Sequence, residues 1–176
     1  MNKPVESFRV GDELYEKPDC LWLIIDGVVK SYTIDPVGKT VILGFWGKQE
    51  LVGKSLSSID PYFLQCLKKV EAIPIPISQA YVFSGMLLNR VEQIQQLSYI
   101  IRELQIKNRM WLLLIWLANK FGREVDGGKL IDFELTTQEL ADSVGIDGIV
   151  ASQTIELLEQ ENLIFRSKTQ YIILKN

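Results

Sequence analysis

Two short helices joined by a glycine are predicted near the carboxyl end of the chain, and this unit restricts the fold more than any other stretch. Thr136 and Glu139 have the Thr-x-x-Glu spacing of a capping box, in which each side chain accepts a hydrogen bond from the other residue's backbone N–H. Gly145 permits the left-handed conformation of a sharp turn, and Asp147 is placed to cap the second helix. Apolar residues recur at helical spacing on the predicted inner faces, namely Leu140, Ala141, Val144, Ala151, Ile155 and Leu158.

A strand is predicted before these helices and a hairpin after them. The segment "LIDFEL", residues 130–135, has the composition of a strand, and the runs at residues 163–165 and 171–174 enclose a polar tip at residues 166–170. Farther upstream, residues 108–121 are apolar nearly all round, as is typical of a core helix. Gly122 is expected to end that helix, and "REVDGGKL" is predicted to be a loop. Together these elements predict a winged helix-turn-helix unit.

The first half of the chain, residues 7–77, has a β-rich pattern. The runs "LWLIID", "VVKSYTI" and "TVILGFW" are β-prone, and "DPVG" at residues 35–38 is a turn sequence because proline presets one dihedral and glycine accepts positive φ. Pro74 and Pro76 block ladder hydrogen bonds, so their segment is predicted to be an edge or exit strand. Short strands joined by tight turns predict a small barrel or roll.

A helix is predicted between the two halves, over residues 81–107. Ile94, Leu97, Ile101 and Leu104 recur in steps of three and four, which gives a narrow apolar seam with polar flanks. This seam fits a two-stranded coiled coil, in which the helix pairs with a second copy of itself. The alternative is a helix that packs on its own roll, because such a helix has a similar stripe.

The residue types present exclude most enzymes. The chain has no histidine, and its two cysteines, Cys20 and Cys66, lie far apart in the sequence. No enzyme activity, metal site or cofactor is therefore expected, because the usual general base, zinc ligands and cluster ligands are missing. Reduced thiols are expected, with a single disulfide as the alternative.

Nothing in the sequence indicates a membrane protein. The amino-terminal stretch lacks the apolar core of a signal peptide. The longest apolar run, residues 110–118, is far shorter than the roughly 20 residues that span a bilayer. A soluble intracellular protein without membrane contact is expected.

The charge of the second predicted helix conflicts with its place in a helix-turn-helix. Residues 146–162 contain no lysine or arginine and four acids, which are Asp147, Glu156, Glu159 and Glu161. Residues 1–119 hold 13 basic and 12 acidic side chains, whereas residues 120–176 hold 6 and 10. The half with the helix-turn-helix is therefore the acidic half, with a net charge of −4, and its charge opposes attraction to an anionic partner.

The sequence resembles the Crp/Fnr superfamily of bacterial transcription regulators over nearly its whole length. "LTTQELADSVG" followed by "TIELLEQENLI" is similar to the helix-turn-helix of that family. The stretch from "FRVGDELYEK" to "ELVGKSL" resembles its β-roll sensor, with glycines at the expected turns. "NRMWLLLIWLANKFGREVDGGKLIDFELTTQELA" is similar to the global nitrogen regulators of cyanobacteria and red-algal plastids, the NtcA-like group.

This resemblance implies an α+β chain with three parts. Residues 1–80 would form a cupin-like double-stranded β-roll of the cyclic-nucleotide-binding type, residues 81–107 a dimerisation helix, and residues 108–176 the winged helix-turn-helix. The implied protein is a homodimer that inserts its second helix into the major groove of double-stranded DNA, with half-sites about 34 Å apart. Bacterial cytoplasm and plastid stroma are the implied locations.

The resemblance also implies a sensor site, and the sequence departs from it. The region "ELVGKSLSSIDPYFLQCLKK" lacks the arginine–serine pair that grips a cyclic-nucleotide phosphate, which argues against cyclic AMP. For 2-oxoglutarate, Gly53, Lys54 and Arg90 keep their places, whereas Gln95 replaces an acid and Asp60 falls near a missing arginine. Arg90 has an alternative role as a solvated residue at the start of a coiled coil. An effector-independent protein is therefore also compatible with the sequence.

The second helix also lacks the two arginines with which the family reads guanine edges and phosphates. Its predicted outward face carries Ile149, Ser152, Gln153 and Glu156. Glutamine can pair with adenine, and an apolar side chain can contact the methyl group of thymine. Ile149, Ser152 and Gln153 are the candidate base-contacting residues.

Candidate phosphate contacts come from outside that helix. Thr136, Thr137 and the backbone of Gln138 lie at a predicted helix amino terminus, where N–H groups attract anions. Arg166 and Lys168 lie in the tip of the hairpin. Simple helix capping is an equally good interpretation of Thr136 and Gln138.

Two hypotheses follow for the function. The first is a sequence-specific, homodimeric DNA-binding transcription regulator of the nitrogen-regulator type, with RNA polymerase as a further candidate partner. The alternative is a degenerate relative that works through protein–protein contacts and binds little DNA, because its acidic helix would repel phosphate and meet a basic protein surface.

Overall fold

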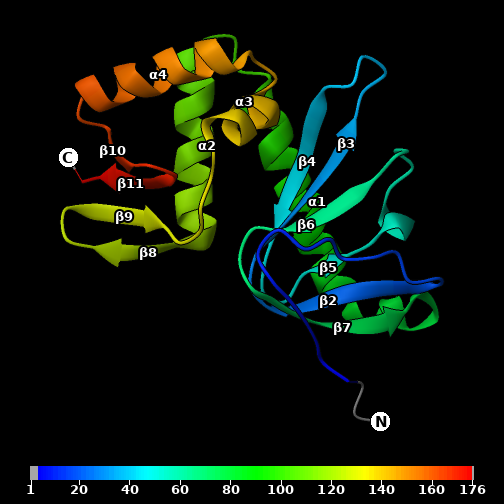
Figure 1. Cartoon of the computed structure of the whole chain (residues 1–176). Helices are drawn as coiled ribbons and strands as arrows, with labels where there is room; N and C mark the ends of the chain where they lie inside the picture. The colour runs from blue at the N-terminus through cyan, green and yellow to red at the C-terminus, as the bar shows by residue number, and fades with distance from the viewer. Residues whose placement is uncertain (1–3, 176) are drawn as a thin grey trace. The chain divides into compact units, whose positions relative to one another are not determined.

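The computed structural model describes residues 4–175 and has two compact units, Met1–Gln95 and Gln96–Asn176 (Figure 1). The first unit holds seven strands and two 3-10 turns, and the helix α1 begins in it. Its elements are β1 (Glu6–Phe8), β2 (Cys20–Asp26), β3 (Val29–Ile34), β4 (Thr40–Trp46), β5 (Leu51–Val52), η1 (Lys54–Leu56), β6 (Phe63–Cys66), β7 (Val70–Pro76), η2 (Ile77–Phe83) and α1 (Ser84–Ile101).

The strands of the first unit form two antiparallel sheets around one core. The strand orders are β1-β7-β2-β5 and β4-β3-β6. Alternate residues of both sheets point inward, as a half-buried strand requires. The shared core contains Phe8, Leu14, Trp22, Ile24, Val29, Trp46, Val52, Leu64, Cys66, Val70 and Ala72. The predicted roll is confirmed.

Two local predictions in this unit are confirmed by the backbone geometry. At residues 35–38 the Asp35 carboxylate accepts hydrogen bonds from the N–H groups of Val37 and Lys39, and Gly38 has a φ of 84°. The two prolines lie in the half of β7 that pairs with β2 alone, because β1 pairs only with residues 70–72. Pro74 and Pro76 therefore lie where β7 has a neighbour on one side only.

The central helix is shorter than predicted. Residues 81–83 belong to η2, and α1 ends at Ile101 instead of residue 107. Beyond that point Glu103 accepts a hydrogen bond from the Gln105 N–H, and Arg109 donates to the Glu103 carbonyl. These side-chain to backbone bonds compete with helical ones and stabilise the break. Leu104 lies in the break with 89% of its surface exposed, so it is not part of a helical seam.

The second unit contains two helices after α2 and one four-stranded antiparallel sheet. Its elements are α2 (Ile106–Phe121), β8 (Gly122–Val125), β9 (Gly128–Ile131), α3 (Thr137–Val144), α4 (Gly148–Gln160), β10 (Ile164–Ser167) and β11 (Gln170–Leu174). The sheet order is β10-β11-β9-β8. The core side of α2 carries Met110, Leu113, Leu114, Leu117 and Ala118.

The loop predicted for "REVDGGKL" is wrong. Those residues form the β8–β9 hairpin, in which Val125 pairs with Gly128 across the turn. The turn is Asp126-Gly127, a favoured two-residue hairpin sequence, and Gly127 has a φ of 83°. Gly128 must be glycine because a Cβ there would lie 2.1 Å from the Ile173 carbonyl oxygen of the neighbouring strand. The predicted strand at residues 130–135 corresponds to β9, which begins and ends earlier, so the winged helix-turn-helix carries one more strand, β8, than the sequence pattern predicts.

Cys20 and Cys66 are free thiols, as expected, and Cys66 is buried. No helix among residues 4–175 combines the length and apolarity needed to cross a membrane. Within the same range, no three potential metal-ligating side chains gather in one place.

Candidate functional site

The helix-turn-helix has the local geometry that its sequence predicts. The Thr136 hydroxyl accepts a hydrogen bond from the Glu139 N–H at 3.1 Å, and the Glu139 carboxylate accepts one from the Thr136 N–H at 2.8 Å. Gly145 has a φ of 70°, a left-handed conformation that a side chain would strain. The Asp147 carboxylate caps α4 by accepting from the Ile149 N–H at 2.8 Å. Both helix starts and the turn between them are therefore determined locally.

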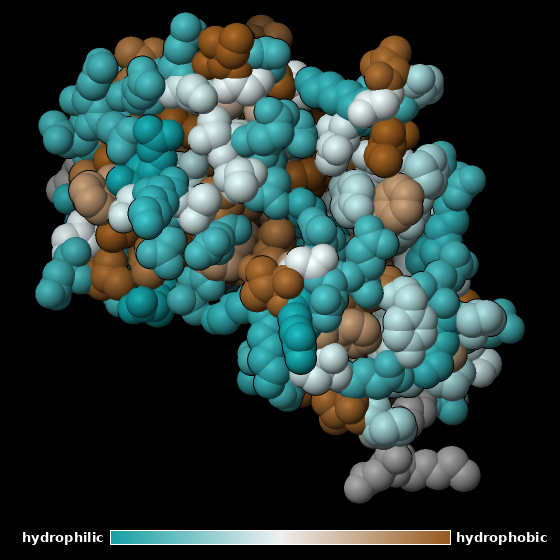
Figure 2. All heavy atoms as spheres, viewed as in Figure 1, coloured by the Kyte–Doolittle hydropathy of each residue, from teal (hydrophilic) through white to brown (hydrophobic). Residues whose placement is uncertain are grey.

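The helix α4 has a buried face and an outward face. Ala151, Ile155 and Leu158 are fully buried, as predicted, and attach α4 to the core of its unit. Ile149 exposes 71% of its surface, and Gln153 is also exposed. Figure 2 shows hydrophobic atoms at the surface over α4, between hydrophilic side chains. An apolar side chain at this position has no packing role within its own unit.

Two of the acids at the carboxyl end of α4 are paired with bases of the same unit. The Glu161 carboxylate lies 2.7 Å from the Lys107 ammonium, and the Glu159 carboxylate lies 3.3 Å from the Arg166 guanidinium. Asp147 is used as the cap of the helix. Of the four acids noted in the sequence, Glu156 is the one without an ion pair or capping role among residues 4–175. The outward charge of α4 is therefore smaller than its composition indicates.

The residues predicted for phosphate contact are held by neighbours to different degrees. Thr136 is exposed, but its hydroxyl serves the capping box. The Gln138 carboxamide donates to Asp142 at 2.7 Å and covers Gly148, where a Cβ would lie 2.6 Å from the Gln138 Oε1. Lys168 is exposed in the β10–β11 turn with a φ of 57°. The contact of Gln138 with the start of α4 has no signal in the sequence.

A buried tyrosine lies beneath the hairpin, next to two other predicted contact residues. Tyr171 is fully buried, and this burial raises the pKa of its phenol. The neighbouring Thr137 hydroxyl and Arg166 guanidinium act against that rise in pKa. Arg166 is therefore paired with Glu159, whereas the buried Tyr171 hydroxyl has no hydrogen-bond partner among residues 4–175.

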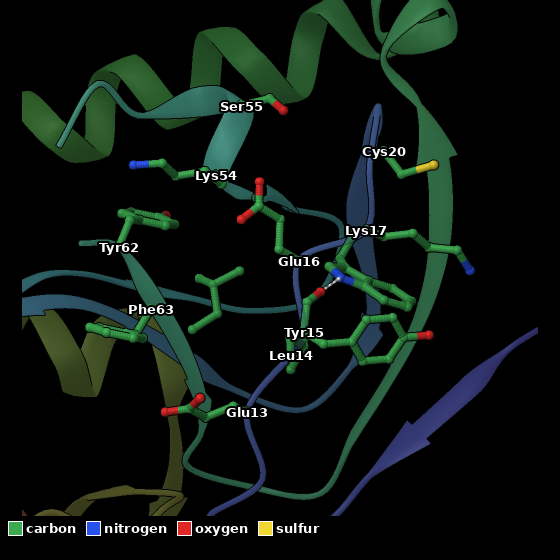
Figure 3. Close-up of a pocket in the computed structure, with 13 residues that line it drawn as sticks. Glu13, Leu14, Tyr15, Glu16, Lys17, Cys20, Lys54, Ser55, Tyr62 and Phe63 are labelled. Carbon is green, nitrogen blue, oxygen red and sulfur yellow. Dashed lines mark hydrogen bonds between the residues drawn. The ribbon is translucent and has the colours of Figure 1, made fainter. Parts of the chain in front are cut away.

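A cavity of about 210 Å³ in the first unit contains two of the predicted effector residues (Figure 3). The side chains of Glu16, Lys54 and Tyr62 point toward it, and Gly53 also lines it. The Lys54 ammonium is 2.9 Å from the Asp60 carboxylate and also donates to the Ile59 carbonyl. Lys17 also lines the cavity and lies 3.1 Å from the Glu6 carboxylate, so both lysines there are already paired.

The other two predicted effector residues are not among those that line this cavity. The Arg90 guanidinium carbon lies 3.8 Å from the ring centroid of Trp46, and its NH1 donates to the Leu51 carbonyl at 3.2 Å. Gln95 is exposed on α1. Gln93, one turn after Arg90, donates to the buried Glu50 carboxylate. Glu50 and Gln93, which the sequence pattern did not single out, therefore help to hold α1 on the roll.

The predicted seam of α1 is only partly at the surface. Ile94 and Ile101 expose 46% and 47% of their surface, whereas Leu97 is half-buried. Leu88 and Val91, which the seam did not include, are exposed at 67% and 52%. The apolar surface of α1 is therefore rotated toward Leu88 and Val91 relative to the predicted seam.

Comparison with characterised proteins identifies regulators of transcription. No protein-family profile matches the chain. The regulatory protein CysR of Synechococcus elongatus is 29% identical over 156 residues, which cover 87% of this chain and 75% of CysR. The fumarate and nitrate reduction regulatory protein of Yersinia pestis is 24% identical, over 99% of this chain and 74% of the relative.

Solved structures show the same architecture. A CRP/FNR family transcriptional regulator from Thermus thermophilus has a TM-score of 0.82 at 20% identity and covers 98% of this chain and 94% of its own. A CRP family regulator from the same organism has a TM-score of 0.83 at 14% identity, with coverages of 97% and 92%. The chain is therefore similar in sequence to the CysR and the fumarate and nitrate reduction regulatory proteins, and similar in fold to Crp/Fnr family transcription regulators.

The relatives and structural neighbours of this Crp/Fnr-like chain are transcription regulators, not enzymes. Within its second unit, the predicted contact residues come from three segments, which are the start of α3, the first turns of α4 and the β10–β11 hairpin. In the first unit, Gly53 and Lys54 share the cavity, whereas Arg90 packs on Trp46. The fold is thus Crp/Fnr-like, whereas the residues predicted for effector binding do not gather in one place.

Proposed function

We propose that this chain is a sequence-specific DNA-binding transcription regulator that acts as a homodimer, with α4 of each copy in the major groove. The observation that carries the proposal is the outward face of α4, where Ile149 is 71% exposed although α4 is otherwise anchored by fully buried residues. A helix-turn-helix presents such a face to base edges. The CysR and fumarate and nitrate reduction relatives support the same role.

The ion pairs at the end of α4 make the helix more compatible with DNA binding than its amino-acid composition indicates. Lys107 and Arg166 neutralise Glu161 and Glu159, so the acids at the carboxyl end of α4 oppose phosphate less strongly. Lys168 supplies an exposed cation in the hairpin, and N–H groups at the start of α3 attract anions. If Arg166 and Lys168 of two copies each contact one phosphate, the log–log salt slope is about −3.6. This is a weak electrostatic contribution, so moderate affinity is expected.

The test is a fluorescence polarisation titration against a pool of random duplexes at about 50 mM salt. Binding at micromolar protein is the expected result, and K168Q, which removes one contact from each of two copies, should lower affinity and reduce the salt slope by about 1.8. The matched control is K175Q, because Lys175 is also exposed in this unit and pairs with Glu124 at 2.8 Å. No change in polarisation with any duplex would contradict the proposal.

The exposed apolar side chains of α1 support a homodimer that pairs through this helix. Four exposed apolar side chains lie on this helix, namely Leu88, Val91, Ile94 and Ile101, and these are too many for a solvated helix to expose without a partner. L88D combined with V91D should convert the dimer to a monomer in sedimentation velocity, and the control V37D, at an 88% exposed turn position, should not. A wild-type chain that stays monomeric at high concentration would contradict the homodimer.

The finer assignment to the nitrogen-regulator type rests on the segment "NRMWLLLIWLANKFGREVDGGKLIDFELTTQELA". On this assignment the protein works in a bacterial cytoplasm or a plastid stroma and contacts RNA polymerase. Because Lys54 pairs with Asp60 and Arg90 packs on Trp46, we propose that it acts without 2-oxoglutarate or cyclic AMP. A reporter fused to a bound promoter, assayed under nitrogen limitation, tests the assignment.

Glu156 favours one other candidate function. Its exposed carboxylate on the outward face of α4 suits a basic protein surface better than a phosphate. A Crp/Fnr-like chain of this kind would act through protein contacts with little DNA binding. Co-sedimentation with candidate protein partners, with and without duplex, separates the two functions, because a partner that binds equally well without DNA favours the second.

A further inference from the structure

The groups that α4 can offer to base edges are few, and the structure reduces them further. Gly148 has no side chain, and the Gln138 carboxamide covers it. The Ser152 hydroxyl donates to the Gly148 carbonyl at 3.0 Å within the helix, so its proton is already used. Ile149 and Gln153 remain, both exposed and one turn apart on the first half of α4. They present one apolar surface and one carboxamide.

These two groups match one kind of base pair. Guanine presents two acceptors in the major groove and is read mainly by arginine or lysine, and residues 146–162 contain neither. A carboxamide fits the donor and acceptor of adenine, and an apolar side chain fits the methyl group of thymine. Glu156, farther along the same face, has acceptors only, so it cannot pair with guanine and could accept only from the amino group of cytosine or adenine.

We infer that α4 selects A·T pairs, with Gln153 pairing to adenine N6 and N7 and Ile149 packing on a thymine methyl group. This inference rests on the proposed DNA-binding function and names the class of sequence that the same face binds. Its specificity comes from shape and hydrogen bonding at base edges, because phosphate contacts carry no sequence information directly. The base pairs that Ile149 and Gln153 contact should therefore be A·T pairs.

The experiment begins with selection of duplexes from a random pool by the full-length wild-type chain, and continues with base analogues in the selected site. Deoxyuridine in place of thymidine removes the methyl group, and 7-deazaadenine removes N7. Wild-type affinity should fall about fourfold on loss of the one methyl group and about 10-fold on loss of the adenine pairing. I149A should be insensitive to deoxyuridine, and Q153A should be insensitive to 7-deazaadenine.

Matched controls lie on the same helix. Q160A removes an exposed glutamine at the far end of α4, and L157A removes a leucine with 47% exposure, so both should keep the wild-type response to each analogue. A selected site in which I149A and Q153A change the preference at G·C pairs, or one insensitive to both analogues, would overturn the inference while leaving DNA binding intact. Failure to retain any duplex would instead overturn the proposed function, and the inference with it.

Discussion

Replacing Arg90 by methionine tests whether this residue holds α1 on the roll instead of waiting for an anionic effector. The guanidinium packs 3.8 Å from the Trp46 ring centroid and donates to the Leu51 carbonyl at 3.2 Å. Methionine keeps an unbranched apolar stem of similar reach but removes the charge and every donor. The substitution therefore removes two interactions and leaves most of the packing in place.

The expected loss of stability can be worked from those two interactions. A cation–π contact contributes about 0.5–2 kcal/mol depending on its burial, and a hydrogen bond from a charged donor about 1.5–3 kcal/mol when it is desolvated. Arg90 is only half-buried, so values near the lower ends apply and the sum is about 2 kcal/mol. For a chain of this length, each kcal/mol shifts Tm by about 2–4 °C. R90M should therefore lower Tm by about 4–8 °C.

Thermal unfolding followed by circular dichroism and by tryptophan emission measures this shift, since Trp46 reports on the contact itself. The control is R102M, because Arg102 is exposed beyond the end of α1 and its loss should change Tm by less than about 1 °C. Equal melting temperatures for R90M and R102M would refute the claim that Arg90 is an internal contact, and would restore it as a candidate ligand-binding cation.

Three further predictions follow from local geometry. T136A should lose the capping box and about 1 kcal/mol, which lowers Tm by about 2–4 °C, whereas T40A, outside the helices, should not show a loss of helix signal. Calorimetric titration with 2-oxoglutarate should give no binding heat, because Lys54 is paired with Asp60; saturable heat would contradict this. Burial raises the pKa of Cys66 to about 12, so the folded state favours the thiol. Its stabilising contribution is present below the unfolded pKa of about 8.5 and is lost as pH rises toward 12, so the urea midpoint of C66A should fall less steeply over that range than that of the wild type.

The parts of the fold that the sequence predicts well are those determined by neighbouring residues. The capping box at Thr136 and Glu139, the left-handed Gly145 and the turn at residues 35–38 each need only a few adjacent positions. The buried positions of α4 follow from its helical period, which residues such as Ala151 and Ile155 confirm. Such features depend little on the rest of the chain, so their sequence signal survives in the structure.

The features that the sequence did not predict depend on contacts between distant segments or on competing local bonds. The end of α1 at Ile101 depends on Arg109, which donates to the Glu103 carbonyl, and the periodic seam gave no sign of it. Gln93 meets Glu50 from 43 positions away in the sequence. The β8–β9 hairpin does not belong with these features, because its turn, Asp126-Gly127, is a favoured hairpin sequence and is visible in the sequence itself.

The candidate interface shows why amino-acid composition alone misjudges the electrostatic potential at the surface of α4. Four acids in residues 146–162 indicate a helix that phosphate would repel. Two of them, Glu159 and Glu161, pair with cations from outside that range, since Lys107 lies in the first turn of α2 and Arg166 lies in β10. On the proposed function, DNA binding is then limited less by repulsion from these two acids than by the small number of cations left to contact phosphate. Because the proposed base-edge contacts of Ile149 and Gln153 would involve no ion release, they would shift the balance from salt-dependent affinity toward sequence discrimination. A measured salt slope much steeper than about −4 would require cations that this argument does not include.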